Sequence, residues 1–388
     1  MYTSIRQATS IFIISCINLL FSFKYLNRLE NKSIMIVGMV LCFALPILFY
    51  ILYVYTKKVD NIKIKTILYS RYLSWIFLLG LILFTIFFFV HYPQNLLKID
   101  RFEMINLFWD NIFTNKCPYC PRTEGTNIPG PFPFYFYIFF PFYLINEVGY
   151  LSLLGVIVFI LLLNHNRSVL KGISNTIILI LLSCPAVIYE ITCRSTIFLN
   201  SVLILCLFLL IKNYNLKNWQ NIFIVSCATG LVLSTRSLSF LFVFLALIFI
   251  YKKNILHRNV IITGLLSAIV FISTFIPIIL LCKKQFITTN PFTVQSSLVP
   301  TYYILIIAVF SSFITFFIKN LLTFCWYVGI CCVALFIGHL YMYGNAGLVE
   351  AIVNSSVDIS YISFSIPFLL YGMLEEPVLN EANYLKVS

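Results

Sequence analysis

Residues 91–147, HYPQNLLKIDRFEMINLFWDNIFTNKCPYCPRTEGTNIPGPFPFYFYIFFPFYLINE, are the one long interruption in a chain that is otherwise almost continuously apolar. Of its 388 residues, 61% are hydrophobic and 10% are charged, and the mean hydropathy is +0.97. In a soluble domain about a quarter of the residues are charged. The composition therefore excludes a soluble protein and predicts an all-α, polytopic membrane protein.

Apolar runs along the chain give the expected spans. The first contains Arg6 and extends to Phe23, and because no small-residue cleavage site follows it, we expect a retained span and not a signal peptide. The other runs lie at residues 34–55, 73–90, 148–163, 173–189, 197–211, 219–234, 237–251, 259–281, 301–318, 322–342 and 358–374. This pattern predicts about 12 transmembrane helices in one membrane domain, residues 1–388, with outer loops at 91–147 and 282–300.

The basic residues set the expected orientation. The net charge is +13, and in a membrane protein such an excess indicates cytoplasmic loops beside anionic lipids. No basic run is long enough to follow a phosphate backbone, so we expect membrane lipids and no nucleic acid as partners. The basic residues gather at 57–71, 167–171, 212–217 and 252–258, and the spans alternate through them if both termini are cytoplasmic. The exception is the basic connection at 24–32, which this topology places outside.

The Pro/aromatic segment PFPFYFYIFFPFYLIN, residues 131–146, must not cross the membrane if this topology is to hold. Its prolines remove backbone donors and discourage a straight buried helix. Tyr135, Tyr137 and Tyr143 are amphipathic rings of the kind found at the headgroup level. We expect an interfacial or re-entrant helix on the outer face, and a Pro-kinked span is the alternative.

The order of motifs in the long loop is similar to that of a known superfamily. An acidic residue after an early span is followed about 18 residues later by Pro-Tyr, and then by a Pro/aromatic segment that leads into the next span. The residues are Asp100, Trp109-Asp110, Cys117-Pro118-Tyr119, Pro131-Phe132-Pro133-Phe134-Tyr135 and Pro141-Phe142. This order resembles the GT-C membrane glycosyltransferases, above all the polyprenol-phosphate-dependent mannosyltransferase type. Those families commonly carry Gly-x-Pro-Tyr and Tyr-Pro-Pro at the places of Pro118-Tyr119 and Pro131-Phe132-Pro133.

The resemblance implies an activity. It is transfer of a sugar from a polyprenyl-phosphate donor to a lipid-linked glycan or other acceptor, on the outer face of a membrane such as the bacterial inner membrane. The acceptor hydroxyl needs a base, and a carboxylate at the mouth of a low-dielectric cavity is suited to that task. Asp100 is the residue that the family pattern favours, and Asp110 is the second candidate. We expect no cofactor, although a divalent cation held by Asp100 with Asp110 or Glu103 is an open alternative.

The anionic donor also requires cations on the same face. Arg194 and Arg236 are expected at outer span ends, where a guanidinium can bind two phosphate oxygens. Glu190 is a candidate partner for Arg194, four residues away. The remaining candidates for the site are Lys283 and Lys284 for the phosphate, Asn290 and Gln295 for sugar hydroxyls, and the motif tyrosines Tyr119 and Tyr135 as supporting residues. A simple role as charges at span ends is the alternative for each cation.

Cys117-Pro118-Tyr119-Cys120 is the one suggestive spacing among 12 cysteines. The same tetrapeptide is the dithiol motif of glutaredoxins, but no alternating strand and helix pattern surrounds it here. A local disulfide in an oxidising outer compartment is the favoured interpretation, and free thiols are the alternative. A zinc site would lack a second pair of ligands.

Two other classes of function stay open. A transporter or flippase of lipid-linked saccharide would also use outer cations and broken helices. A noncatalytic scaffold in a polysaccharide assembly complex has no specific support in the sequence.

The topology makes the first testable prediction. In variants that keep only Cys117 and Cys120, a membrane-impermeant thiol reagent should label intact, reduced cells, because the long loop lies outside while residues 57–71 lie inside. Labelling that appears only after permeabilisation would reverse the orientation.

Overall fold

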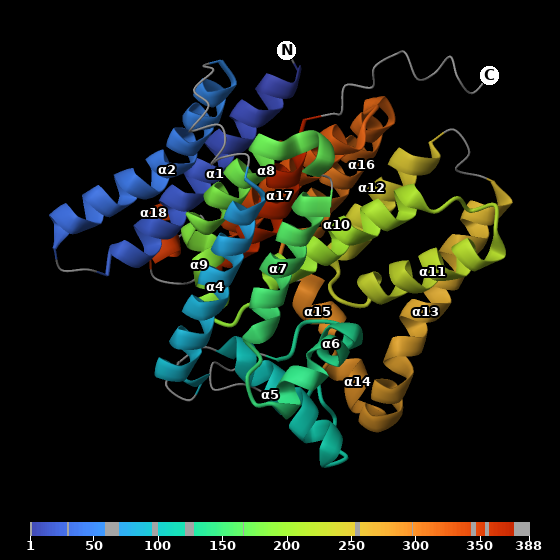
Figure 1. Cartoon of the computed structure of the whole chain (residues 1–388). Coiled ribbons are helices and arrows are strands. Elements are labelled where there is room, and N and C mark those ends of the chain that lie inside the picture. The colour runs from blue at the N-terminus through green and yellow to red at the C-terminus, as the bar shows by residue number, and fades with distance from the viewer. Residues whose placement is uncertain are drawn as a thin grey trace, which may run out of the picture.

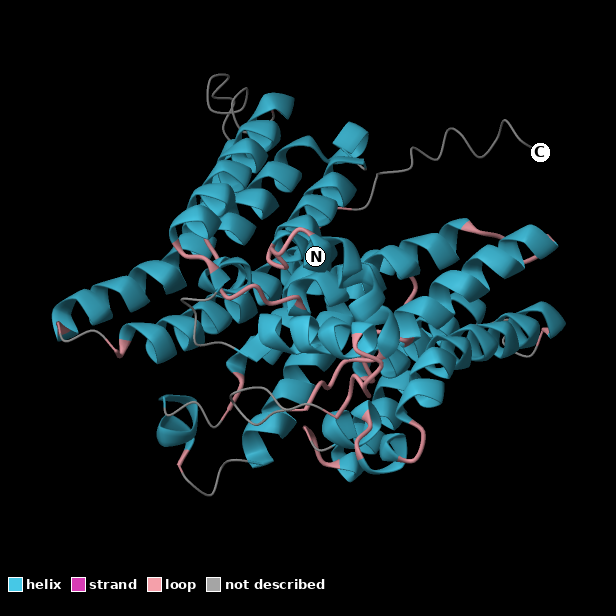
Figure 2. Cartoon of the chain, turned by 90° about the horizontal axis from the view of Figure 1, so that it is seen from below, coloured by secondary structure: helices cyan, strands magenta, loops and turns pink. Residues whose placement is uncertain are grey.

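A computed structural model describes residues 2–28, 31–58, 70–94, 100–120, 128–165, 167–252, 257–296, 298–342, 347–353 and 357–375. Within these ranges every regular element is a helix, and there is no strand (Figure 2). Helices satisfy their backbone hydrogen bonds internally, which is the condition for crossing hydrocarbon. The prediction of an all-α fold is confirmed for the described residues.

The helices follow the predicted apolar runs closely (Figure 1). The first half contains α1 (Tyr2–Leu26), α2 (Lys32–Lys58), α4 (Arg71–His91), α5 (Asp100–Phe113), α6 (Pro133–Leu144), α7 (Tyr150–His165), α8 (Arg167–Leu182) and α9 (Pro185–Thr192). The second half contains α10 (Ile197–Asn213), α11 (Trp219–Leu233), α12 (Leu238–Tyr251), α13 (Arg258–Cys282), α14 (Gln285–Thr288), α15 (Pro291–Ser296), α16 (Thr301–Phe317), α17 (Leu321–Met342), α18 (Leu348–Val353), the 3₁₀ helix η3 (Ile359–Phe364) and α19 (Ser365–Gly372).

Five of the described helices are long and apolar enough to cross a membrane, namely α1, α2, α4, α13 and α17. Two bent pairs raise the number to seven if each pair forms one span: α8 with α9, and α14–α15 with α16. The remaining apolar helices are shorter than a span. About 12 crossings would require both bent pairs and every shorter apolar helix except α6 to cross as well, so the figure of 12 stays a prediction.

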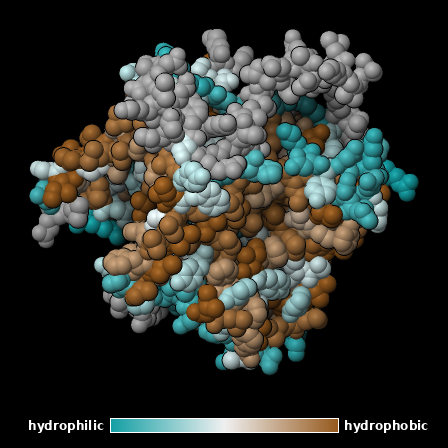
Figure 3. Space-filling model, viewed as in Figure 1, coloured by the Kyte–Doolittle hydropathy of each residue, from teal (hydrophilic) through white to brown (hydrophobic). Residues whose placement is uncertain are grey.

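The outer surface of the long helices is suited to lipid. Val40 on α2, Phe87 on α4, Leu265 on α13 and Val309 on α16 are each at least 60% exposed. Hydrophobic residues cover much of the middle of the face seen in Figure 3. Because water disfavours such a continuous apolar surface, this face is expected to contact acyl chains.

Contacts distant in sequence place both ends of the chain on one side. Arg6 Nη2 donates to the carbonyl of Leu374 at 3.0 Å, and Lys57 forms an ion pair with Glu375. The opposite end of the molecule holds α5, α6, α14 and α15 (Figure 1). The two predicted outer loops therefore lie together, on the side away from the termini.

The connection that disagreed with the predicted topology has two exposed basic residues, Arg28 and Lys32, and a third basic residue, Lys24. The ammonium group of Lys24 is buried and donates to the carbonyl of Val357 at 2.8 Å. A lysine held by the protein in this way contributes little to the charge asymmetry that orients loops. The disagreement of the connection after α1 with an outer position is thus reduced to Arg28 and Lys32.

Helix α6 begins where the sequence requires it, because Pro133 occupies the first turn, where no backbone donor is needed. Its 12 residues reach about 18 Å, well short of the roughly 30 Å of hydrocarbon, which disfavours a Pro-kinked span. Phe136 of α6 stacks on Phe108 of α5 with 3.8 Å between ring centroids, and Trp109 donates to the Phe136 carbonyl. α5 and α6 therefore form one packed layer.

The local Cys117–Cys120 disulfide is not what the structure shows. Cys117 is bonded to Cys282 at the end of α13, 165 residues away, with 4.4 Å between the Cα atoms. Cys120 is a free thiol that contacts Gln285 at 3.3 Å. The Cys117–Cys120 pairing predicted from the spacing was wrong, because a disulfide forms between cysteines whose Cα atoms are close in the fold, whatever their distance in sequence.

The disulfide gives a second prediction. Non-reducing peptide mapping of the purified protein should recover the Cys117 peptide linked to the Cys282 peptide, with Cys120 open to alkylation. A Cys282→Ser variant should lose the linked pair, and a Cys120→Ser variant should keep it. Recovery of a Cys117–Cys120 peptide from native protein would contradict this pairing.

Candidate functional site

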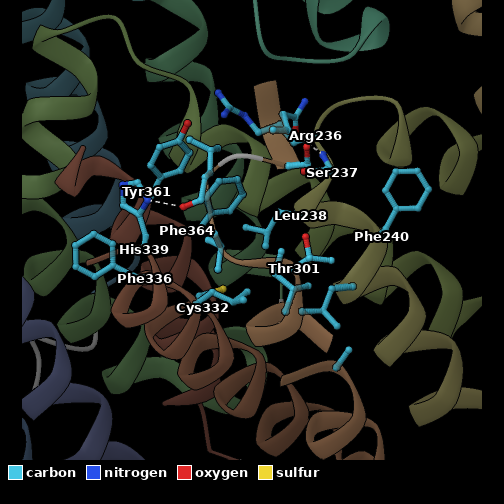
Figure 4. Close-up of a pocket in the computed structure, with 18 of the residues that line it drawn as sticks. Arg236, Ser237, Leu238, Phe240, Thr301, Cys332, Phe336, His339, Tyr361 and Phe364 are labelled. Carbon is cyan, nitrogen blue, oxygen red and sulfur yellow. Dashed lines mark hydrogen bonds between the residues drawn. The ribbon is translucent and has the colours of Figure 1, made fainter. Parts of the chain in front are cut away.

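Two cavities meet beside α5, α6, α12, α15, α17 and η3. The apolar groove has a volume of about 860 Å³ and is lined by Leu238, Phe240, Phe244, Ile304, Leu335 and Phe336, among others. The polar chamber is smaller, about 380 Å³, and its walls include Arg101, Tyr135, Ser195, Thr196 and Asp358. Arg236, Gln295, Leu298, His339 and Tyr361 line both cavities. The groove and the chamber are thus two compartments of one site, and Figure 4 shows residues that line the groove.

One wall of the chamber is an ion pair between distant parts of the chain. Arg101, in the first turn of α5, donates from Nη2 to both carboxylate oxygens of Asp358 at 2.8 Å. Its Nη1 donates to Ser195 Oγ at 2.5 Å, and Nη1 lies 3.7 Å from a carboxylate oxygen of Glu190. Nη1 and Nη2 of Arg101 are therefore turned towards acceptors of the protein itself.

Asp358 faces the chamber from the residue before η3. Its side chain is 43% exposed, although it pairs with Arg101. Enclosure by protein opposes ionisation, but the Arg101 guanidinium and the hydrogen bonds from Ser360 outweigh that effect and lower the pKa of the Asp358 carboxyl. Asp358 is thus ionised at neutral pH.

Arg236 stands where the two cavities join, next to Ser237 in Figure 4. Its guanidinium carbon lies 5.4 Å from the ring centroid of Tyr135, which is held by a 2.6 Å bond between the Tyr135 hydroxyl and Thr196. Among the described residues no carboxylate forms an ion pair with Arg236, and its buried Nε has no hydrogen-bond partner. Arg236 is half-buried, and a cation in such a position with a buried, unused donor favours an anionic ligand.

Gln295 and His339 fix the wall between the compartments. Gln295 donates to the Gly130 carbonyl and accepts from the Ser237 amide, each at 2.5 Å, which ties α15 to the long loop and to α12. His339 Nδ1 lies 2.7 Å from the Leu298 carbonyl, so that nitrogen carries the proton, because a carbonyl can only accept.

Arg194 lies outside both cavities. It forms an ion pair with Glu147 at 2.8 Å, donates to the Tyr92 carbonyl at 2.9 Å and lies over the Phe89 ring. The expected pairing with Glu190 does not form, because Arg194 follows the end of α9 with φ at 53°, which turns its side chain away from the helix. Glu190 instead accepts from the Phe198 amide at 3.1 Å and supports Arg101.

The other predicted residues are spread over the outer layer. Asp110 is exposed and accepts from Tyr143 at 2.6 Å, a bond that raises the pKa of Tyr143 to about 12. Lys283 and Lys284 are exposed at the turn after α13, outside both cavities. Tyr119 is fully buried and donates to the Pro131 carbonyl at 2.8 Å, so it holds the loop together. The side chain of Asp100 lies outside the described residues, although its backbone begins α5.

Of the residues proposed from the sequence, Arg236, Tyr135 and Gln295 line the polar chamber. Arg101, Asp358 and His339 also line it, but the sequence analysis gave them no role in the site. A signal for Asp358 was present, because it is one of only 13 acidic residues and directly precedes an apolar run. An ionisable residue in that setting is costly unless it is paired or used. His339 gave no signal, since a lone histidine at a span end has no characteristic spacing.

Asp100 and Asp110 are too far apart on α5 to bind one metal ion together. Asp100 and Asp110 are ten residues apart on one helix, about 15 Å along its axis, which is too far for a shared ion. Among the described residues no group of three or more His, Cys, Asp or Glu side chains could hold a metal.

Comparison of the chain with protein-family models, curated proteins and solved structures finds no match. The site must therefore be interpreted from its own chemistry.

The position of Arg236 gives the third prediction. Arg236→Lys keeps the charge but loses the planar fork, so binding of farnesyl phosphate to the purified protein should weaken by about 10-fold or more. Arg258→Lys, the same change at an exposed position at the start of α13, is the matched control and should bind as the wild type does. If Arg236→Lys binds farnesyl phosphate as tightly as the wild type does, the assignment of Arg236 to the phosphate is wrong.

Proposed function

We propose that this protein transfers a sugar from a polyprenyl-phosphate donor to the hydroxyl of a lipid-linked glycan or other acceptor on the outer face of a membrane. The observation that supports this most is the junction at Arg236. Such a donor has an apolar chain, an anionic phosphate and a polyhydroxylated head in that order. The apolar groove, Arg236 and the polar chamber offer matching environments in the same order.

The groove is suited to an isoprenoid chain that enters from the bilayer. Its rim includes Phe240, Phe244 and Phe292, which are 39%, 51% and 43% exposed, while Leu335 and Phe336 close its inner end. Because the acyl chains it leaves are equally apolar, the isoprenoid gains here through van der Waals packing against these rings. A volume of about 860 Å³ lies at the upper end for small-ligand pockets, as an extended chain requires.

The charges of the two arginines have different uses in this proposal. The Arg101 charge is balanced by Asp358 and supported by Glu190. Arg236 has no carboxylate partner among the described residues, so it is the cation left for the donor phosphate. The positive charge would also stabilise the lipid phosphate as it leaves.

The transfer itself balances without a cofactor. The acceptor oxygen forms a bond to the anomeric carbon, the bond from that carbon to the donor phosphate breaks, and polyprenyl phosphate leaves. The acceptor proton goes to a carboxylate base. We retain Asp100 for this role, because position 100 precedes Arg101 and lies one turn before Met104, two residues that line the chamber.

A divalent cation is the remaining alternative to this metal-free scheme. Asp100 and Glu103 are three residues apart on α5 and thus share one side of its first turn. If they hold an ion, chelation should abolish transfer, and added Mg²⁺ or Mn²⁺ should restore it.

The fourth prediction concerns the base. Asp100→Asn keeps the size of the side chain but cannot take a proton, so transfer should fall roughly 10²-fold to 10⁴-fold while farnesyl phosphate binding is retained. The readout is the mass of lipid-linked oligosaccharides in cells that carry each variant. Asp110→Asn should transfer normally, because Asp110 lies at the outer surface and not in the chamber.

The outcomes separate the enzyme from its rivals. Loss of transfer only in Asp110→Asn would move the base to Asp110. Full transfer in both variants would exclude base catalysis by either residue. If Arg236 were nevertheless required for export of the saccharide, a transporter or flippase of lipid-linked saccharide would be favoured instead.

A further inference from the structure

The part of the chamber wall formed by Asp358 offers carboxylate oxygens as hydrogen-bond acceptors. Oδ1 of Asp358 accepts from Arg101 Nη2, from the Ser360 amide at 3.1 Å and from Ser360 Oγ at 2.5 Å. Oδ2 accepts one hydrogen bond among the described residues, from Arg101 Nη2. A carboxylate oxygen has two lone pairs, so Oδ2 keeps the capacity to accept from a ligand.

The terminal nitrogens of Arg101, Nη1 and Nη2, already donate to groups of the protein. Nη2 serves Asp358 and Ser360, and Nη1 serves Ser195. The exposure of the two partners fits this arrangement, since the Arg101 side chain is 16% exposed and that of Asp358 is 43% exposed. What a ligand meets here is therefore an ionised acceptor that Arg101 and Ser360 hold in place.

We propose that Asp358 selects the sugar, because it binds hydroxyls of a neutral sugar and rejects an acidic one. This rests on the function proposed above. A sugar hydroxyl can donate to Oδ2, whereas the carboxylate of a uronic acid can only accept, so two acceptors would face each other without a proton between them. Arg236, at the other side of the chamber, is occupied by the donor phosphate and cannot balance the extra negative charge.

The lowered pKa of the Asp358 carboxyl supports this role over that of a base. A carboxylate held ionised by a guanidinium is a weak proton acceptor but a strong acceptor of hydrogen bonds. The small chamber, about 380 Å³, is suited to a single sugar unit and not to a long glycan, since it lies near the lower limit for ligand pockets.

The test uses the full chain in lipid nanodiscs and competition against radiolabelled farnesyl phosphate. The competitors are farnesyl phosphoglucose and farnesyl phosphoglucuronate, with the manno and galacto pairs measured in the same way. The wild type should bind the neutral member of at least one pair about 10-fold more tightly than the acidic member.

Three variants resolve the cause of this preference. Asp358→Asn adds an amide donor, so the ratio of the dissociation constants of the acidic and the neutral member should fall close to 1. Asp358→Glu keeps an acceptor-only group beside Arg101, so the preference should persist even if both members bind more weakly. Glu375→Gln makes the same carboxyl-to-amide change at the opposite end of the molecule and should leave the preference unchanged.

The two proposals fail in different ways. Equal wild-type binding of the members of every pair, or an unchanged preference in Asp358→Asn, would overturn the role of Asp358 while leaving the donor site in place. Unchanged binding of farnesyl phosphate by Arg236→Gln would instead overturn the proposed function, whatever the sugar preference. Retained farnesyl phosphate binding by Asp358→Asn shows that the variant is folded. If Asp358→Asn no longer binds farnesyl phosphate, the comparison of the wild type with Asp358→Glu replaces it. A preference for the neutral member in both proteins supports the role of Asp358, and equal binding of the two members by either protein overturns it.

Discussion

The ion pair between Arg101 and Asp358 is the interaction on which the candidate site depends. It joins the first turn of α5 in the long loop to the start of η3, 257 residues further along the chain. Removing two charges from water is costly unless further hydrogen bonds complete the pair. Ser195 and Ser360 supply those bonds, so three segments of the chain meet at one guanidinium. The same convergence forms a wall of the polar chamber.

A second constraint holds the long loop over the helices. The Cys117–Cys282 disulfide ties the segment between α5 and α6 to the end of α13, and the Phe132 amide donates to the Thr235 carbonyl at 3.0 Å. These contacts fix the position of Tyr135, whose ring lies against Arg236. The described residues of the loop that line the chamber, among them Gly130, Pro131 and Tyr135, therefore form part of the cavity wall.

Arg194 and Arg236 differ in the side chains that pack against them, and this difference separates a structural residue from a candidate functional one. Both follow the end of an apolar helix, and their sequence contexts are alike. Glu147 lies against Arg194 and Phe89 covers it, because Gly149 leaves the space that a Cβ atom would fill. No carboxylate approaches Arg236 among the described residues, so its charge remains for a ligand. Arg236 alone of the two borders a cavity.

The sequence by itself determined the class of this protein, the positions of its helices and the separate character of residues 91–147. These properties follow from local composition, because apolar runs form helices and Pro133 starts α6. Only the tertiary structure decided which polar residues share a site and which cysteine Cys117 meets. Arg101, Arg236, His339 and Asp358 come from four distant segments with no common spacing. Long-range packing brings them together, and neither helical periodicity nor a short motif records such contacts, because each residue's partner is set by three-dimensional proximity.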